Sequence, residues 1–537
     1  MTDTNPEELL DKRQGADESE VLPGTEGDDL IDGFGGDDTI TGLGGDDILI
    51  GGDGDDVIDG GTGKNRLYGD AGDDKITSNG DGDVIDAGEG DNTIIIGSDA
   101  VGGEFSSGDG NDSYVIEEGA SGTYRIESGD GDDSYLIAEG VNGGIIINAS
   151  NGKNSIVSES RVSSINTGEG EDNIILDLGS SSGIRSGDGK DYVELRGKLG
   201  DNWDTDGTNN IWLGDGDDVA YLYGGTQIVG SYDNGHSWDN GIFGGTGDDS
   251  IYLDGGSNYG FANGGEGDDL INATKSNDTR VLSGESGQDQ IWGSPGNDNI
   301  FGGNDDDSLE GGGGSDNIYG GHGNDQIKAI GEDNKLSGDE GNDLIESGSG
   351  DDTLYGGNND DVLIGGGGND VIYGDNGGGS KGDDGSIDTA VFSGASTDYK
   401  ISRATDTDYG YVYYIQDKRT DSPDGLDTLY DIDRLRFTDG ESIVPDEAPV
   451  FVDESLNLGY LDTAFSNDLN PVVSDQLRTV VLEDDEITYG PAESTGTYGD
   501  LTVSETGEIT FTANSDVIQD ESTSVLTDSF DITATNG

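Results

Sequence analysis

The chain has 537 residues, and 116 Asp and Glu against 24 Lys and Arg give it a formal net charge of −92. This balance excludes nucleic acid as a natural partner, because the phosphate backbone would repel the surface. The absence of cysteine excludes disulfides, thiol nucleophiles and cysteine-ligated zinc. No apolar run approaches the ~18 residues of a membrane-spanning helix. With 30% hydrophobic residues, the composition alone is typical of a disordered chain.

Residues 1–23 are polar and acidic. They lack the basic start and apolar core of a secretory signal peptide. We expect a disordered acidic leader with at most one helical turn around residues 7–10.

Residues 24–95 consist of eight consecutive nonapeptides, from GTEGDDLID to AGEGDNTII. Position 6 of each is Asp or Asn, and position 8 is Ile or Leu. A fixed short period predicts a solenoid. The repeat GGTGKNRLY places Lys64 and Asn65 where carboxylates usually stand, and this predicts a weak or empty metal site there.

Residues 96–283 keep the motif but stretch its period, mostly to 18–21 residues. Every second repeat has lost its Gly-Asp loop and kept a strand. This predicts a continuing β-helix that has potential metal-binding loops on one side and loops without the Gly-Asp motif on the other. Asn154 and Asn209, which follow Lys153 and Thr208, predict that many of these turns carry no ion. The position-6 residues of this region are Asp112, Asp133, Asn154, Asp172, Asp191, Asn209, Asp218, Asp249 and Asp269.

Residues 284–373 repeat every nine residues ten times without a slip. Alternation along a strand points only the position-8 side chain inward. One aliphatic side chain cannot offset the ordering of nine residues at roughly 1–2 kcal/mol each. Stacked carboxylates would also repel each other unless a cation lay between them. Carboxylate and carbonyl oxygens suit Ca²⁺, so we expect folding to be coupled to calcium binding.

These repeats resemble the RTX (repeats-in-toxin) nonapeptide Gly-Gly-x-Gly-x-Asp-x-aliphatic-x. The resemblance implies an all-β fold, a parallel β-roll in which two repeats make one coil and multiple Ca²⁺ ions lie between loops one coil apart. It also implies export by a type I system. Inter-coil sites in the two blocks would hold at most about 14 ions. The predicted Ca²⁺ ligands are Asp29, Asp38, Asp47, Asp56, Asp74, Asp83, Asp249, Asp269, Asp289, Asp298, Asp307, Asp316, Asp325, Asp343, Asp352, Asp361 and Asp370.

Two further modules follow the repeats. Residues 374–445 resemble the β module that often follows RTX blocks, and we expect antiparallel strands that cap the last coil. Residues 446–537 alternate apolar and polar residues and resemble the cadherin-like or VCBS-type β-sandwich domains of bacterial adhesins. Because such a domain would normally add another strand after Gly537, we expect that the chain is a fragment or that another domain completes the fold.

Other motifs give weaker signals. Trp203, Trp212, Trp238 and Trp292 form either a glycan-stacking platform or, more in keeping with the usual role of aromatics, packing in wider coils. Residues 202–207 resemble the start of an EF-hand loop, but Leu213 stands where its bidentate Glu belongs. His322 is interpreted as a solvated variable position.

No distinctive nucleophile, base or zinc constellation is visible, so the sequence predicts no enzyme. The first functional hypothesis is a secreted calcium-binding protein with a structural or adhesive role at the bacterial surface, with glycans or matrix and S-layer proteins as partners. The second is the non-catalytic, calcium-dependent part of a secreted RTX enzyme or toxin. The third is a polysaccharide- or ice-binding module.

Overall fold

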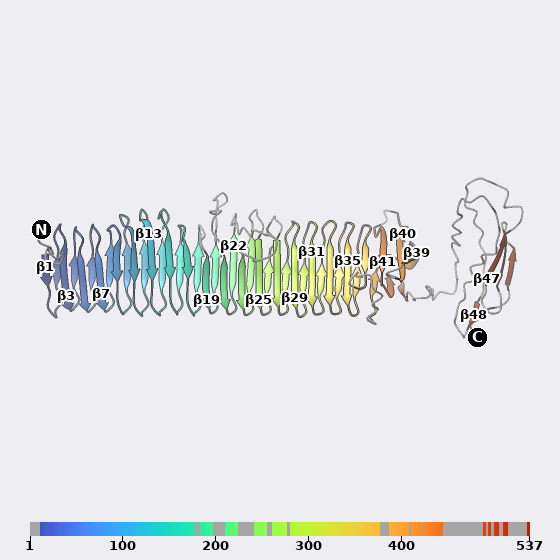
Figure 1. Ribbon diagram of the computed structural model, residues 1–537, viewed down its shortest axis with the longest axis horizontal. Coiled ribbons are helices and arrows are strands. Elements are labelled where there is room, and N and C mark those ends of the chain that lie inside the picture. Colours follow the sequence, from blue (N-terminus) through green and yellow to red (C-terminus); the bar gives the residue numbers. More distant parts are fainter. Residues whose placement is uncertain are drawn as a thin grey trace, which may run out of the picture. The chain divides into compact units, whose positions relative to one another are not determined.

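The computed structural model describes residues 11–177, 183–196, 210–223, 241–254, 260–276, 280–375, 386–406, 410–420 and 423–443, together with five short strands between 487 and 536. The chain divides into two compact units, residues 1–446 and 447–537. The first unit is a solenoid of parallel strands (Figure 1).

Two sheets, called sheet A and sheet B, run along the first unit, and each coil contributes one strand to each sheet. The parallel strands of sheet A are β1 (Asp11–Gln14), β3 (Asp29–Gly35), β5 (Ile48–Asp53), β7 (Arg66–Ala71), β9 (Asp83–Asp86), β11 (Val101–Ser106), β13 (Ser121–Glu127), β15 (Ile145–Asn148), β17 (Ser164–Asn166), β19 (Ile184–Asp188), β21 (Ile211–Asp215), β23 (Ile242–Thr246), β25 (Gly260–Glu266), β27 (Arg280–Ser286), β29 (Asn299–Asn304), β31 (Asn317–His322), β33 (Lys335–Glu340), β35 (Thr353–Asn358), β37 (Val371–Tyr373) and β41 (Leu426–Tyr430).

Sheet B alternates with sheet A along the chain. Its parallel strands are β2 (Val21–Pro23), β4 (Thr39–Thr41), β6 (Val57–Asp59), β8 (Lys75–Ser78), β10 (Thr93–Ile96), β12 (Ser113–Ile116), β14 (Ser134–Ile137), β16 (Ser155–Ser158), β18 (Asn173–Leu176), β20 (Tyr192–Leu195), β22 (Val219–Tyr223), β24 (Ser250–Asp254), β26 (Leu270–Asn272), β28 (Gln290–Trp292), β30 (Ser308–Glu310), β32 (Gln326–Lys328), β34 (Leu344–Glu346), β36 (Val362–Ile364), β38 (Thr389–Val391) and β42 (Arg434–Phe437).

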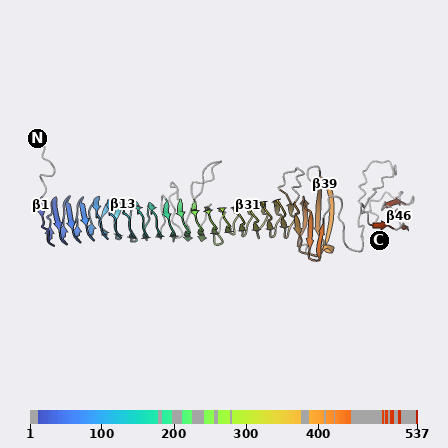
Figure 2. The same ribbon diagram turned by 90° about the horizontal axis from the view of Figure 1, so that it is seen from below.

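The core lies between the two sheets and consists mainly of position-8 side chains. On sheet A, Ile31 of β3 lies directly opposite Leu49 of β5, and both are fully buried. On sheet B, Ile40 of β4 and Ile58 of β6 form the corresponding buried pair. At about 4.8 Å per strand, the parallel stack from β1 to β41 extends roughly 90 Å. Figure 2 shows the same strand order after a 90° turn. The all-β parallel β-roll predicted from the nonapeptides is confirmed.

The solenoid begins earlier than the sequence indicated. Residues 11–23, which we expected to be disordered, form the first coil, with β1 paired to β3 and β2 paired to β4. The expectation was wrong because Glu20 occupies position 6 of a degenerate repeat. Its backbone N–H donates to the Asp38 carboxylate at 2.7 Å, and Leu22 packs against the core. Residues 1–10 lie outside the described residues.

The stretched repeats of residues 96–283 continue the same solenoid. Strand β10 of the first block pairs in parallel with β12, and β26 pairs with β28 of the second block. Most of the extra residues lie outside the paired strands, so the register continues from β12 to β14 and from β13 to β15, whereas β11 and β13 pair with a shift between Val101 and Gly103. Asn209 and residues 202–207 lie outside the described residues.

Antiparallel strands end both sheets. The short 3-10 helix η2 (Ser396–Asp398) leads into β39 (Tyr399–Asp406), which pairs with β40 (Gly410–Asp417), and β40 pairs with β41 at the end of sheet A. On sheet B, β43 (Gly440–Ile443) pairs with β42. Arg419 bridges the buried carboxylates of Asp417 and Asp424, at 2.7 and 2.9 Å.

Within the second unit the structure describes two small antiparallel sheets. One consists of β44 (Ile487–Tyr489) and β48 (Ala534–Asn536), and the other of β45 (Ala492–Thr495), β46 (Gly499–Val503) and β47 (Ile509–Ala513). The likeness of residues 446–537 to adhesin domains stays a prediction.

Candidate metal centre

The position-6 side chains stack into ladders that join one coil to the next. In each step the backbone N–H of one position-6 residue donates to the Oδ1 atom of the position-6 residue in the following coil. Asp307 N–H, for example, donates to Asp325 Oδ1 at 2.8 Å, and Asp325 N–H donates to Asp343 Oδ1 at 2.7 Å. All the predicted ligands are buried.

The turns before sheet B form one ladder that runs from Glu20 to Asp433 without a break, with N–H to oxygen distances of 2.7–3.3 Å. The turns before sheet A form two separate ladders. One spans Asp29 to Asp83, and the other runs from Arg280 through Asp298 to Asp427. Within the described part of the middle coils, the position-6 ladder is therefore kept on the edge before sheet B and is not continued on the edge before sheet A.

The second oxygen of most position-6 carboxylates is a buried acceptor without a hydrogen-bond donor. A buried oxygen without a donor costs free energy, and a bound cation would remove this cost. These oxygens are therefore candidate cation ligands. Asp83 and Asp298 differ, because the Ser78 and Ser294 hydroxyls donate to their Oδ2 atoms. Asp29 also accepts a hydroxyl at Oδ2, from Thr25, and its unsatisfied oxygen is Oδ1. The predicted ligands with an unsatisfied oxygen are Asp29, Asp38, Asp47, Asp56, Asp74, Asp249, Asp269, Asp289, Asp307, Asp316, Asp325, Asp343, Asp352, Asp361 and Asp370.

The turns with asparagine at position 6 show which other oxygens lie close to the side-chain end of position 6. The Asn92 amide Nδ2 donates to the carbonyl oxygens of Gly88 and Gly90, positions 2 and 4 of its own loop, at 3.2 and 3.0 Å. The Asn154 amide does the same to Ser150 and Gly152. A carboxylate in that place brings an oxygen without a proton toward two carbonyl oxygens. A hard cation satisfies all three, and oxygen-only ligands fit Ca²⁺.

The electrostatics of the ladders point the same way. Burial, and after it the neighbouring carboxylates, raises the pKa of Asp289 to about 8 and the pKa of Asp343 to about 7. Burial likewise raises the pKa of Asp47 to about 6. The ionised ladder is thus unfavourable by itself, and a bound cation would relieve both the desolvation and the repulsion.

Comparison with known families gives the same result. The profile of the RTX calcium-binding nonapeptide repeat matches at several overlapping positions, which together cover residues 14–94 and 263–380. The chain carries RTX repeats. These repeats bind Ca²⁺ at multiple sites. The assignment of individual position-6 aspartates as Ca²⁺ ligands stays a prediction. No curated protein matches the chain.

The RTX turns also contain a second ladder that the sequence interpretation missed. Position-5 side chains accept a backbone N–H from the following coil, in the opposite direction to position 6. Asp306 Oδ1 accepts from Asn324 N–H at 2.6 Å, and Asn324 Oδ1 accepts from Asn342 N–H at 3.0 Å. The available signal was the predominance of Asp and Asn at position 5 of the repeats.

The RTX loops need glycine where coils approach each other. Gly54, at position 4, has φ +135°, and a Cβ atom there would lie 2.4 Å from the Gly36 carbonyl oxygen of the preceding coil.

Each turn supplies at most one position-6 carboxylate per coil. Accordingly, among the described residues no three His, Asp or Glu side chains gather around one point. The described residues also include no helix with the length and apolar character needed to cross a membrane.

The aromatic side chains near the RTX blocks cover each other. Tyr221 and Tyr252 are parallel within 8° with ring centroids 4.5 Å apart, and Tyr355 and Tyr373 are parallel within 4° at 4.9 Å. Parallel rings this close are stacked on each other, so each ring covers one face of its neighbour. This favours packing over a glycan platform. Trp203 and Trp238 lie outside the described residues, and His322 is exposed beside Glu340.

Proposed function

We propose that the chain belongs to a secreted calcium-binding protein with a structural or adhesive role at the bacterial surface or in its matrix. The observation that carries this proposal is the unbroken position-6 ladder from Glu20 to Asp433. Because one ladder joins the coils of the whole roughly 90 Å stack, Ca²⁺ bound in the RTX blocks would stiffen parts of one long spacer. The β-roll is a structural element and not a catalytic one.

Several features support an extracellular setting. Ca²⁺ that neutralises buried carboxylates must be abundant where the chain folds, and RTX proteins are typically exported by type I systems. The net charge of −92 keeps the folded surface strongly acidic and soluble. The partners that fit this setting are surface glycans and other matrix or S-layer proteins.

Retention on cell envelopes tests the adhesive role. Labelled full-length chain is mixed with isolated bacterial envelopes in Ca²⁺, in Mg²⁺ and in excess chelator, and the bound fraction is measured after washing. Retention in Ca²⁺ alone is the expected result. Equal binding in all three conditions, or none in Ca²⁺, would contradict the proposal. A catalytic domain in the same reading frame would instead favour the non-catalytic part of an enzyme or toxin.

One face of sheet B supports a second candidate, binding to an ordered surface such as ice or crystalline polysaccharide. Two outward ranks follow neighbouring strands in register, and neither contains a charge. The ranks repeat about every 4.8 Å along the solenoid. They consist of Thr93, Ser113, Ser134, Ser155 and Asn173, and of Ile95, Val115, Leu136, Val157 and Ile175.

A charge in the aliphatic rank tests this candidate. Leu136 is 54% exposed, so L136K should fold and abolish both inhibition of ice recrystallisation and sedimentation with insoluble polysaccharide. L344K, at an exposed outward position of sheet B in the second RTX block, is the matched control. Equal behaviour of the two variants would exclude this face as the binding surface.

A further inference from the structure

In most turns the residue at position 1 varies together with the residue at position 6, and the exceptions are Gly60/Asn65 and Leu213/Asp218. Glycine at position 1 accompanies most of the predicted Asp ligands. Alanine at position 1 accompanies only Asn at position 6, in the pairs Ala87/Asn92, Ala149/Asn154 and Ala329/Asn334. Serine or threonine accompanies only Asp, in the pairs Ser78/Asp83, Ser107/Asp112, Ser128/Asp133, Thr167/Asp172, Ser186/Asp191 and Ser347/Asp352.

The geometry at position 1 explains this coupling. A Cβ atom built on Gly338 would lie 2.0 Å from Asp343 Oδ2 and 2.6 Å from the carbonyl oxygen of Gly356, the position-1 residue of the next coil. At Gly244 the corresponding distances, to Asp249 Oδ2 and the Gly264 carbonyl oxygen, are 2.1 and 2.2 Å. The glycine turns therefore hold two oxygens close together around a bare Cα atom. Any side chain at position 1 crowds this place.

Where a polar side chain is present, it hydrogen-bonds to oxygens of the turn that a cation would otherwise contact, although Oδ2 of Asp112, Asp133, Asp172 and Asp191 has no donor, as in the Gly/Asp turns. The Ser186 hydroxyl donates to the Leu213 carbonyl oxygen at 2.9 Å, and the Thr167 hydroxyl donates to the Ser186 carbonyl oxygen. Tyr114 donates to the Ser107 hydroxyl at 2.7 Å, and that hydroxyl lies against the Asp112 carboxylate and opposes the rise in its pKa that burial causes. In the alanine turns, the Asn92 and Asn154 amides bond to the loop carbonyl groups.

These filled turns are contiguous. After Gly69/Asp74, the next Gly/Asp pair along the chain is Gly244/Asp249. On the opposite edge of the same coils, buried Ala100, Ala120 and Val162 occupy the bends that connect sheet B to sheet A. The described part of residues 78–196 therefore contains no Gly/Asp turn on either edge.

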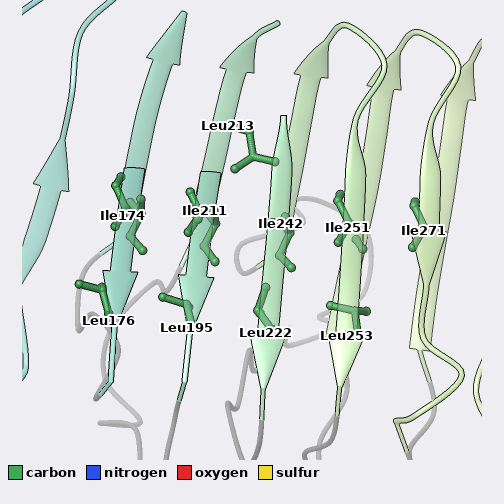
Figure 3. Packing of buried hydrophobic residues seen from close by; sticks show 14 of the residues in the cluster. Ile174, Leu176, Leu195, Ile211, Leu213, Leu222, Ile242, Ile251, Leu253 and Ile271 are labelled. Atoms are coloured by element: carbon green, nitrogen blue, oxygen red, sulfur yellow. The ribbon is translucent and has the colours of Figure 1, made fainter. Parts of the chain in front are cut away.

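The core of these coils is larger than in the RTX blocks. An RTX coil buries one aliphatic side chain per sheet, for example Ile31 and Ile40. Several strands between β10 and β20 bury a second apolar side chain, so that the coil of β13 and β14 buries Tyr124, Ile126, Tyr135 and Ile137, whereas β17 buries Ile165 alone. Figure 3 shows the end of this second row, with Leu176 and Leu195 aligned with Leu222 and Leu253 of the following coils.

We propose that residues 78–196 form a segment that folds without calcium, because position-1 side chains and a doubled apolar core take the place of the cation. The two RTX blocks then add their coils to the exposed ends of this segment when Ca²⁺ is present. Asp83 is excluded from the ligands under this proposal, although the sequence predicted it as one.

Hydrogen exchange of the full-length chain, followed by mass spectrometry in Ca²⁺ and in excess chelator, tests the proposal. Removing Ca²⁺ should change exchange less than about tenfold in β10–β20 and at least about a hundredfold in β3–β7 and β29–β37. Exchange in β10–β20 as fast as in the RTX blocks would overturn the proposal. Full protection of every strand in chelator would also overturn it, since no segment would then be distinct.

Ion counting by native mass spectrometry provides a second readout. Thr167→Ala with Asp172→Asn copies the neighbouring Ala149/Asn154 turn, and the number of bound Ca²⁺ ions should not change. Gly338→Ala with Asp343→Asn copies the neighbouring Ala329/Asn334 turn and is the matched control, which should lose at least one ion. Loss of ions from the first variant would show that the filled turns bind Ca²⁺ and would overturn the proposal.

Discussion

A position-6 aspartate in this solenoid has two oxygens with different tasks. Oδ1 accepts a backbone N–H from the preceding coil, as Asp325 does from Asp307. In most of these aspartates the other oxygen has no donor. The nine-residue period was sufficient to predict these aspartates and the calcium. It could not predict the role of position 1, because the distance from a Cβ atom to Oδ2 depends on how coils stack and not on spacing along the chain.

Removing adjacent ligands of one stack should lower the calcium count. Asp325→Ala with Asp343→Ala leaves the loop carbonyl oxygens without their carboxylate partners, so we expect the loss of at least two ions, measured by native mass spectrometry. An unchanged stoichiometry would contradict the assignment of these aspartates. The control is Asp306→Ala. It removes a position-5 side chain whose Oδ1 atom accepts a backbone N–H, and it leaves the position-6 carboxylates in place.

Acid should partly replace calcium. The folded-state pKa of Asp289 is raised to about 8 and that of Asp343 to about 7, above the ordinary value of 3.8. Between about pH 4 and 7 the folded state therefore binds more protons than the unfolded state, and its stability without Ca²⁺ falls as pH rises through this window. Circular dichroism of the decalcified chain should show more β signal at pH 5 than at pH 8. The same or less signal at pH 5 would contradict this.

At the scale of elements, each strand is short and depends on its neighbours in the stack. The second RTX block was predictable strand by strand, because one buried aliphatic residue marks each strand. The middle coils were predictable only in outline, since their added residues and doubled core follow no fixed spacing. The first coil was missed because Glu20 replaces the aspartate of the motif.

The antiparallel end of sheet A depends on one arginine. Arg419 is the counter-charge for Asp417 and Asp424, whose side chains are 0% and 7% exposed. Arg419→Ala removes the cation that bridges two buried carboxylates and should cost about 3 kcal/mol. The exposed pair of Arg125 and Glu127 provides the control, and Arg125→Ala should cost below about 1 kcal/mol. Denaturant midpoints in Ca²⁺ compare the variants, and equal midpoints would contradict the importance of this network.

At the scale of the whole molecule, calcium should govern most of the fold but not all of it. A Ca²⁺ titration followed by far-UV circular dichroism should show a cooperative gain of β signal that Mg²⁺ does not reproduce. A minor β signal should already be present in chelator, from residues 78–196. A spectrum that is complete in chelator would contradict calcium-coupled folding of the RTX blocks.

The ladders of positions 5 and 6 run in opposite directions, so every pair of neighbouring regular coils is joined by the same set of hydrogen bonds. At the junction of residues 306–307 with residues 324–325, each side donates one backbone N–H and accepts one through a side chain. Inserting or deleting 18 residues in register therefore leaves no donor or acceptor unmatched. Such a protein can lengthen or shorten by whole coils through duplication of its own gene segments, and its reach changes in equal increments while its internal chemistry stays the same.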